Sequence, residues 1–325
     1  MNAVSRVCTA LAAAALCTLP ATAMAQTDKY PTKSVRMLVP FAPGGGTDIT
    51  ARLIAQKMSE VLGQQVIVDN RAGGGGTIGA ETAVRAAPDG YTVIMVSGSY
   101  GTNAALYNLP YDPVKDIQAL VMIGESGFVL ALHPSVPAKS VPEFIAHAKA
   151  NPGKLNYAST GTGGITHLTT ELFDLMAGTK MTHIPYKGTG PALTDLIAGQ
   201  VDLMFGNLPE FLPQIRGGKL KAYGTTYFER AALAPDIPTI AEQGYPGFYT
   251  DSWYGIVAPA SMPKEVVARM NAEVSRALAL PEVRDALLKR GLDPIPSSPE
   301  RFGEFIRSEI AKYAKIVKDA GIKID

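Results

Sequence analysis

Cysteine is scarce in this sequence, and both cysteines, Cys8 and Cys17, lie near the N-terminus. That region has the pattern of a secretory signal peptide, because an apolar run over residues 7–19 follows a basic residue and a small-x-small cleavage signal ends at Ala25. We expect residues 1–25 to be removed. The mature chain would then contain no cysteine, which excludes disulfides, thiolate metal sites and cysteine nucleophiles.

Charge of one sign, long apolar runs and paired histidines are missing too. The net charge is +1, 18% of the residues are charged and no basic stripe is present, so we expect no nucleic-acid or anionic-membrane partner. The run over residues 7–19 is too short for a membrane span of about 20 residues, so we expect a soluble protein. The histidines, His133, His147, His167 and His183, have no metal-ligand spacing. We therefore expect neither a metal nor a cofactor.

A glycine-rich segment, residues 39–48, is the most distinctive feature that is present. It follows a short apolar run typical of a buried parallel strand and precedes a helical stripe that ends at Gly63. Glycines at a helix N-terminus leave unpaired N–H groups exposed, which suits a carboxylate or a phosphate. The alternative is a tight turn in which Thr47 or Asp48 caps the helix.

The same arrangement occurs a second time, over residues 156–176, where an apolar strand, a glycine loop and a helix follow one another. Gly163 and Gly164 then correspond to Gly45 and Gly46. Two matching loops predict two matching lobes. The length supports this, because about 300 mature residues exceed what one core usually holds.

Strands and helices alternate along the chain, which predicts an α/β fold with a doubly wound, mainly parallel sheet in each lobe and ligands at the carboxyl ends of the strands. The expected division is lobe one at residues 26–127 and 250–296, lobe two at residues 128–249, and a C-terminal helix at residues 297–325 packing across both. Since the chain crosses between the lobes more than once, we expect a clamshell.

Two enzyme interpretations compete with a binding protein. Asp69 follows a glycine turn at the interval of a ribose-binding acid, but Ile49 occupies the place of the third glycine of the dinucleotide fingerprint. A serine hydrolase could use Ser159 or Ser97 with His167, yet neither serine lies in a Gly-x-Ser-x-Gly elbow. We therefore expect no catalytic residue, and keep an exported α/β enzyme with a dinucleotide or ester substrate as the alternative.

Several ordered motifs, at residues 39–48, 70–79, 157–164, 185–192 and 253–259, resemble those of the Bug or TctC-like receptors of tripartite tricarboxylate transporters. The resemblance covers essentially the whole mature chain. It implies a two-lobed, type II-like periplasmic binding protein that closes on a small carboxylate and presents it to membrane permease subunits. We expect a monomer in the periplasm, and a sensory receptor is the second alternative.

The resemblance also implies ligand-binding residues, in loops that hold a carboxylate largely through backbone N–H groups and ordered waters. They are Phe41, Ala42, Gly45, Gly46, Thr47 and Asp48 in lobe one, and Ser159, Thr160, Gly161, Gly163 and Gly164 in lobe two. Ser97, Tyr186 and Asn207 are further candidates because each ends a presumed strand at the binding edge. The carboxylate of Asp48 would repel a bound carboxylate, so we expect it to cap its helix or accept an ammonium or hydroxyl group.

Overall fold

A computed structural model describes residues 30–227 and 229–320 of the chain, so the predicted signal peptide and its cleavage site lie outside the described residues. The strands are β1 (Val35–Val39), β2 (Val66–Asn70), β3 (Thr92–Ser97), β4 (Ile117–Leu132), β5 (Asn156–Ser159), β6 (Thr182–Pro185), β7 (Leu203–Asn207), β8 (Lys221–Thr225), β9 (Asp251–Pro259) and β10 (Asp293–Pro294). The helices are α1 (Gly46–Leu62), η1 (Gly74–Gly76), α2 (Thr77–Val84), α3 (Ser99–Leu106), α4 (Val141–Ala150), α5 (Ile165–Ala177), α6 (Thr189–Ile197), α7 (Leu208–Arg216), η2 (Ala241–Gln243), α8 (Lys264–Ala279), α9 (Pro281–Leu288) and α10 (Pro299–Ala320).

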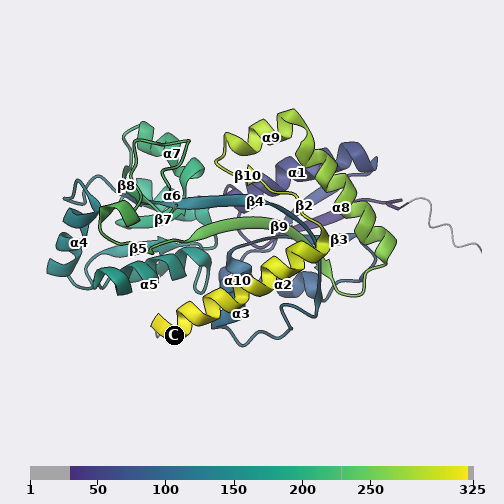
Figure 1. Ribbon diagram of the computed structural model, residues 1–325, viewed down its shortest axis with the longest axis horizontal. Helices are drawn as coiled ribbons and strands as arrows, with labels where there is room; N and C mark the ends of the chain where they lie inside the picture. The colour runs from purple at the N-terminus through teal and green to yellow at the C-terminus, as the bar shows by residue number, and fades with distance from the viewer. Residues whose placement is uncertain (1–29, 228, 321–325) are drawn as a thin grey trace, which may run out of the picture.

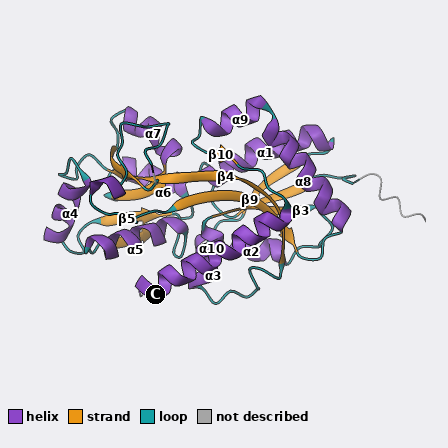
Figure 2. Ribbon diagram, in the orientation of Figure 1, coloured by secondary structure: helices purple, strands orange, loops and turns teal. Residues whose placement is uncertain are grey.

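The molecule is elongated, with one lobe at each end and two long strands running between them (Figure 1). Lobe two, with α4 to α7, lies at the left of the view, and lobe one, with α1, α8 and α9, lies at the right. Helices flank the strands in both lobes (Figure 2). This is the two-lobed α/β arrangement that the sequence predicts.

The sheet is mixed, which corrects the expectation of mainly parallel sheets. Its strand order is β2-β1-β3-β9-β4-β7-β5-β6. The flanks are parallel as predicted, since β1 pairs with β2 and β3, and β5 pairs with β6 and β7. The middle is antiparallel, because β4 pairs in that sense with β7, β8, β9 and β10. A chain that returns to lobe one along its own outgoing strand must run antiparallel to it.

Strand β4 is one strand of 16 residues, whereas the sequence predicts two strands near residues 120–124 and 128–133. The polar and glycine residues between those runs suggest a break, but β4 continues through them by changing partner. It pairs with β9 as far as Gly127 and with β7 from Phe128 onward. Such a change of partner lets one strand belong to both lobes. The lobe boundaries expected from the sequence stay predictions.

Each lobe has a core on both faces of its sheet, because neighbouring strand residues point to opposite faces. In β1, Met37 belongs to the cluster under α1 and α8, while Leu38 belongs to the cluster under α2 and α10. Helix α10 packs Phe302 into lobe one and Tyr313 into the core of lobe two. It therefore contributes to the cores of both lobes.

Two helices of the structure, α3 and α7, are absent from the sequence-based expectation. The sequence of α3 contains glycine, serine, threonine and asparagine, which are weak helix formers. Its contacts with α10 stabilise it instead. Helix α7 contains Pro213 in its interior, which is a signal that normally ends a helix. Both helices begin at strand ends that face the interface between the lobes.

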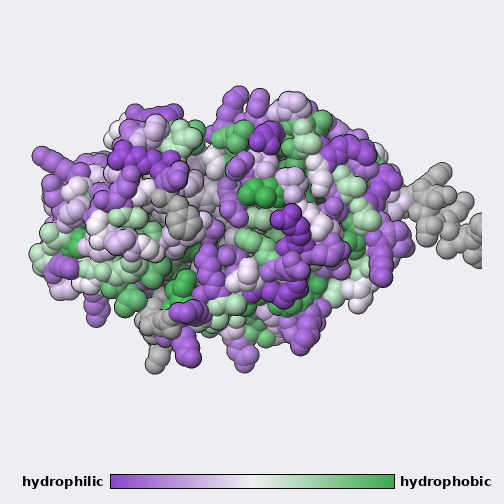
Figure 3. Space-filling view, in the orientation of Figure 1, coloured by the Kyte–Doolittle hydropathy of each residue, from purple (hydrophilic) through white to green (hydrophobic). Residues whose placement is uncertain are grey.

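Hydrophilic residues cover most of the face shown in Figure 3, and hydrophobic residues lie there in small groups. The exposed large hydrophobic side chains include Ile67 of β2, Ile78 of α2, and Leu175 and Met176 of α5. Over residues 30–227 and 229–320, no helix has both the length and the apolar character needed to cross a membrane.

Candidate functional site

The two glycine loops start their helices with the same backbone geometry. Gly45 precedes α1 with φ −90° and ψ 169°, and Gly164 precedes α5 with φ −68° and ψ 162°. Gly45 therefore corresponds to Gly164 and not, as the sequence suggested, to Gly163. Neither helix start has a hydrogen bond from a capping side chain. The alternative in which Thr47 or Asp48 caps α1 is therefore wrong. The backbone of Gly46 bonds to Glu210 and the N–H of Ile165 to Ser99, so it is the next N–H groups of each first turn that lack an intrahelical acceptor.

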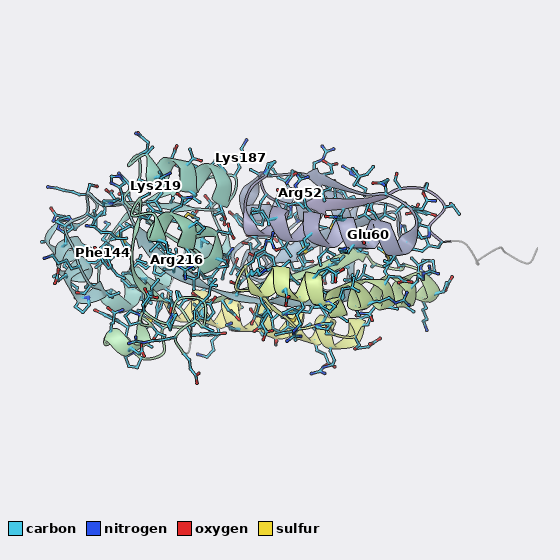
Figure 4. The ribbon with its side chains drawn as sticks, turned by 90° about the horizontal axis from the view of Figure 1, so that it is seen from above. Arg52, Glu60, Phe144, Lys187, Arg216 and Lys219 are labelled. Carbon is cyan, nitrogen blue, oxygen red and sulfur yellow. The ribbon has the colours of Figure 1, made fainter. Side chains whose placement is uncertain are left out.

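The loops of the two lobes touch one another. The N–H of Ala42 donates to the carbonyl of Lys187 at 2.7 Å, which joins the β1–α1 loop to lobe two. Seen from above, Lys187 lies on the side of lobe two next to α1, the helix that carries Arg52 (Figure 4). The hydroxyl of Thr102 donates to the carbonyl of Gly163 at 2.8 Å. The described conformation is therefore one in which the lobes are closed on each other.

A small cavity of about 30 Å³ lies between the two helix starts. Its polar lining consists mostly of hydroxyl groups from both lobes. The predicted residues Phe41, Gly45, Gly46, Thr47, Ser97, Thr160 and Asn207 line it, together with Ser99, Phe128, Ile165, Thr166, Thr189, Ser252 and Tyr254. Hydroxyl groups and open helix N–H groups are all hydrogen-bond donors, so this cavity suits a carboxylate.

Asp48 does not line this cavity, and its carboxylate is fully occupied by hydrogen bonds from other groups. It accepts hydrogen bonds from the N–H of Gly44 at 3.0 Å, from Arg52 at 3.0 Å and from the amide of Asn70 at 2.9 Å. Burial opposes its ionisation, but these hydrogen bonds outweigh burial and lower the pKa of Asp48. Asp48 therefore holds the glycine loop in shape, and its carboxylate has no acceptor position left for an ammonium group.

The other predicted residues lie just behind the cavity and do not line it. Ala42 bonds across the lobes, Ser159 and Gly161 bond to each other, and Gly164 donates to the carbonyl of Gly161. The N–H of Gly163 donates to Nδ1 of His167 at 3.1 Å. The hydroxyl of Tyr186 donates to Asp195 at 2.7 Å and so stays within lobe two. These residues shape the loops.

A serine and a histidine are in contact, but they differ from the pair considered in the sequence. Ser159 Oγ lies 2.6 Å from Nε2 of His183, and the ring of His183 stacks on that of His167 at 4.0 Å between centroids. Burial lowers the pKa of His167 to about 4 and that of His183 to about 3. Ser159 is 0% exposed. A neutral imidazole beside a buried hydroxyl supports the loop and leaves no accessible nucleophile.

Asp69, the acid of the dinucleotide alternative, is engaged in ion pairs. Its carboxylate accepts from Arg36 at 2.7 Å and from Arg71 at 3.1 Å. Burial raises the pKa of Asp69, and the hydrogen bonds from these two arginines lower it. The net shift is downward. Arg71 is thus bound to Asp69 together with Arg36. Asp69 braces the end of β2 and is not presented to a ribose.

A second, larger cavity of about 210 Å³ adjoins the small one. Gly46, Asn207 and Tyr254 line both cavities. The rest of the larger one is lined by Ile49, Thr50, Ser126, Pro209, Glu210, Arg290 and Leu292. Its surface is mainly apolar. A volume below the roughly 300–1,000 Å³ of drug-sized sites fits a compact metabolite.

Glu210 is the main residue that the sequence analysis missed. Its Oε1 accepts from the amide of Asn207 at 2.6 Å. Burial raises the pKa of Glu210 to about 7, although hydrogen bonds from Asn207, the backbone of Gly46 and Thr189 act in the opposite direction. In the sequence, the one indication of Glu210 was its position next to Pro209, in the first helical turn after the end of a strand. Without a prediction of α7, that signal had no structural context.

Ser99, Thr166, Thr189 and Tyr254 were missed for related reasons. Ser99 is at the start of α3, and its Oγ accepts the N–H of Ile165 at 3.1 Å. Tyr254 lies in the motif near residue 253, but only the pairing of β9 with β3 and β4 brings its hydroxyl to the interface. Short-range patterns do not contain that pairing.

Comparison with known proteins identifies the family. Residues 50–322 match the sequence model of the tripartite tricarboxylate transporter family receptor. Protein BugT of Bordetella pertussis (strain Tohama I) is 37% identical over 300 residues, which are 91% of this chain and 92% of that protein. The chain therefore has a relative of the same length.

Solved structures agree with this assignment. The periplasmic binding protein BugD has a TM-score of 0.88 and 34% identity, over 90% of this chain and 99% of that chain. MatC from Rhodopseudomonas palustris, solved with bound malate, has a TM-score of 0.85 and 36% identity, over 89% of this chain and 100% of that chain. These relatives are periplasmic solute-binding receptors and not enzymes, and the chain belongs with them to the tripartite tricarboxylate transporter receptor family.

Proposed function

We propose that this protein binds a small organic acid between its lobes and delivers it to a tripartite tricarboxylate permease. The observation that carries the proposal is the small cavity at which two uncapped helix starts and a set of hydroxyl groups meet. Helix N-termini stabilise negative charge, so the cavity can hold a carboxylate without an arginine. The malate bound to MatC supports the choice of a carboxylate.

The ligand carboxylate would contact the first-turn N–H groups of Thr47 and Asp48 and the hydroxyls of Ser97 and Thr160. Ser97 is 5% exposed and lines the cavity. Calorimetric titration at neutral pH with a panel of mono- and dicarboxylates tests this arrangement. Ser97→Ala should weaken binding of the best acid by about three- to tenfold, the value of one lost hydrogen bond.

A matched control is Ser308→Ala, since Ser308 is exposed on α10 and far from the cavity lining. That variant should bind as the wild type does. Failure of every carboxylate to bind, or recovery of a chemically changed ligand after incubation, would contradict the proposed function.

Closure would occur by bending where the lobes exchange strands. The partner change of β4 between Gly127 and Phe128 supports a lobe two of residues 128–249, and β9 begins at Asp251 on the return. Small-angle scattering should show a smaller radius of gyration with the best acid than without it. An unchanged radius would argue against a clamshell.

Export and partnership are part of the proposal. N-terminal sequencing of the secreted protein should begin at Gln26, and the protein should be recovered from the periplasm as a monomer. Permease subunits should retain the acid-loaded receptor more strongly than the acid-free one. Retention that is independent of the acid would favour a sensory role over transport.

A further inference from the structure

Asn207 and Glu210, which line the larger cavity, each carry one oxygen acceptor that has no donor. Among the described residues, Oδ1 of Asn207 and Oε2 of Glu210 are buried side-chain oxygens without a hydrogen-bond partner. Asn207 is 9% exposed and lines both cavities, while Glu210 lines the larger one. Buried acceptors without donors are costly, so a group that supplies donors would be favoured there.

The orientation of the Asn207 amide follows from its neighbours. Its Nδ2 lies 2.6 Å from Oε1 of Glu210 and 2.7 Å from the hydroxyl of Tyr254. Exchanging nitrogen and oxygen would place an amide oxygen against a carboxylate oxygen, which is repulsive. The amide oxygen is therefore the atom left without a partner, and the two open positions at this wall are both acceptors.

We propose that Asn207 and Glu210 form a subsite that selects carboxylic acids carrying a hydrogen-bond donor, above all an ammonium group, between the carboxylate and a compact apolar tail. The proposal rests on the proposed function, since it places the carboxylate in the small cavity. The order of the groups follows from the geometry: hydroxyls line the small cavity, the acceptors lie where the cavities adjoin, and the larger cavity is mainly apolar.

Charge supports an ammonium over a hydroxyl. A plain carboxylate in the small cavity would lie near the Glu210 carboxylate, whereas an ammonium would compensate both charges. Burial raises the pKa of Glu210 to about 7, so part of the population is ionised at pH 7.5. An ammonium within hydrogen-bond distance favours that ionised form. The chemical class is thus an α-amino acid with a small branched or linear apolar side chain.

The test uses sets of acids that differ only in the donor. L-leucine, L-2-hydroxy-4-methylpentanoate and 4-methylpentanoate share a tail, and L-aspartate, L-malate and succinate form a second set. Each is titrated into the purified wild-type protein at pH 7.5. In each set the amino acid should bind most tightly and the unsubstituted acid about tenfold or more weakly, the scale of a charge-assisted hydrogen bond. The leucine set should bind more tightly than the aspartate set.

Glu210→Gln provides the second measurement. It should weaken L-leucine by about tenfold and bind 4-methylpentanoate at least as tightly as the wild type does, because only the amino acid uses the charge and the unsubstituted acid is repelled by it. Glu265→Gln, at an exposed position in the first turn of α8, is the matched control and should change neither value. Because the ligand series needs only the wild-type protein, the test does not depend on the folding of the variant.

The outcomes separate the two proposals. If unsubstituted acids bind as tightly as the amino acids in both sets, the acceptor subsite is wrong while the receptor function stands. If no acid of either set binds, the proposed carboxylate function fails, and the subsite fails with it. If the hydroxy acids exceed the amino acids, the inference of an ammonium is overturned.

Discussion

The β1–α1 loop of lobe one and the β5–α5 loop of lobe two begin their helices with the same backbone but are held by different side chains. The lobe-one loop is held by charge, through Asp48, Arg52 and Asn70. The lobe-two loop is held by neutral groups, with His167 accepting the N–H of Gly163 and Thr166 accepting the N–H of Thr160. The same donor surface can thus be built on a charged support or a neutral one, and acid weakens both.

The loops differ further in what their glycines face. A side chain at Gly46 would meet the ends of the Glu210, Tyr254 and Asn207 side chains, which belong to the cavity wall. One at Gly163 would meet the ring of Tyr107, and its backbone has φ 75°. A positive φ disfavours residues other than glycine. Gly46 is therefore tied to the binding surface and Gly163 to the fold.

The largest expected effect comes from breaking each loop at its glycine. Gly163→Val should lower the free energy of unfolding by about 2–4 kcal/mol, from backbone strain and the clash with Tyr107. Gly46→Val should weaken binding of the best acid by about tenfold or more with a smaller loss of stability. Chemical denaturation and calorimetric titration measure the two quantities.

The control for this pair is Gly153→Val. Gly153 also has a positive φ, of 72°, but a side chain there would meet no atom within 4 Å. The stability lost in Gly153→Val therefore measures backbone strain alone. If Gly46→Val and Gly163→Val reduce stability equally, or if both retain wild-type affinity, the proposed difference between the loops is wrong.

Asp48→Asn tests the charged support of the lobe-one loop. The variant keeps the size of the side chain but loses the charged hydrogen bonds to Arg52. Its free energy of unfolding at pH 7 should therefore be about 1–3 kcal/mol lower than that of the wild type. Since the pKa of Asp48 is lowered in the folded state, its stabilisation is present above the ordinary aspartate pKa and is lost as the pH falls through the folded value. The difference from wild type should therefore begin to shrink below pH of about 4 and vanish only below the lowered pKa of the folded state. Asp89→Asn, on the exposed surface, is the control.

His167→Gln tests the neutral support of the lobe-two loop. Burial lowers the pKa of His167 to about 4, so between the ordinary histidine pKa and that value the unfolded chain binds more protons than the folded one. Wild-type stability should fall as the pH drops from about 6.5 to about 4, by up to about 1.4 kcal/mol per pH unit for one such group. The variant should show a shallower fall in urea unfolding series. An identical slope would show that His167 is not buried in its neutral form.

The smallest expected effect concerns Tyr186, which was a ligand candidate in the sequence and donates to Asp195 in the structure. Tyr186→Phe should cost about 0.5–1.5 kcal/mol of stability, the value of one hydrogen bond, and leave affinity within about twofold. A large loss of affinity at unchanged stability would return Tyr186 to the ligand-binding residues.

The sequence by itself determined the local units of this protein. The apolar strand at residues 35–39, the glycine turn after it and the helix that ends at Gly63 follow from composition and periodicity, and Gly63 has the predicted left-handed conformation, with φ 66°. These features depend on neighbours within a few residues. The repetition of the unit was sufficient to predict two lobes and a donor surface in each.

Only the tertiary structure decided which side chains meet at that surface. Ser99 and Glu210 lie on helices whose residues favour other conformations, and long-range packing supplies the stability that their propensities lack. Tyr254 reaches the interface because β9 pairs with both β3 and β4, and Asp48 meets Asn70 because β2 pairs with β1. Such contacts join residues far apart in sequence, so no local pattern encodes them.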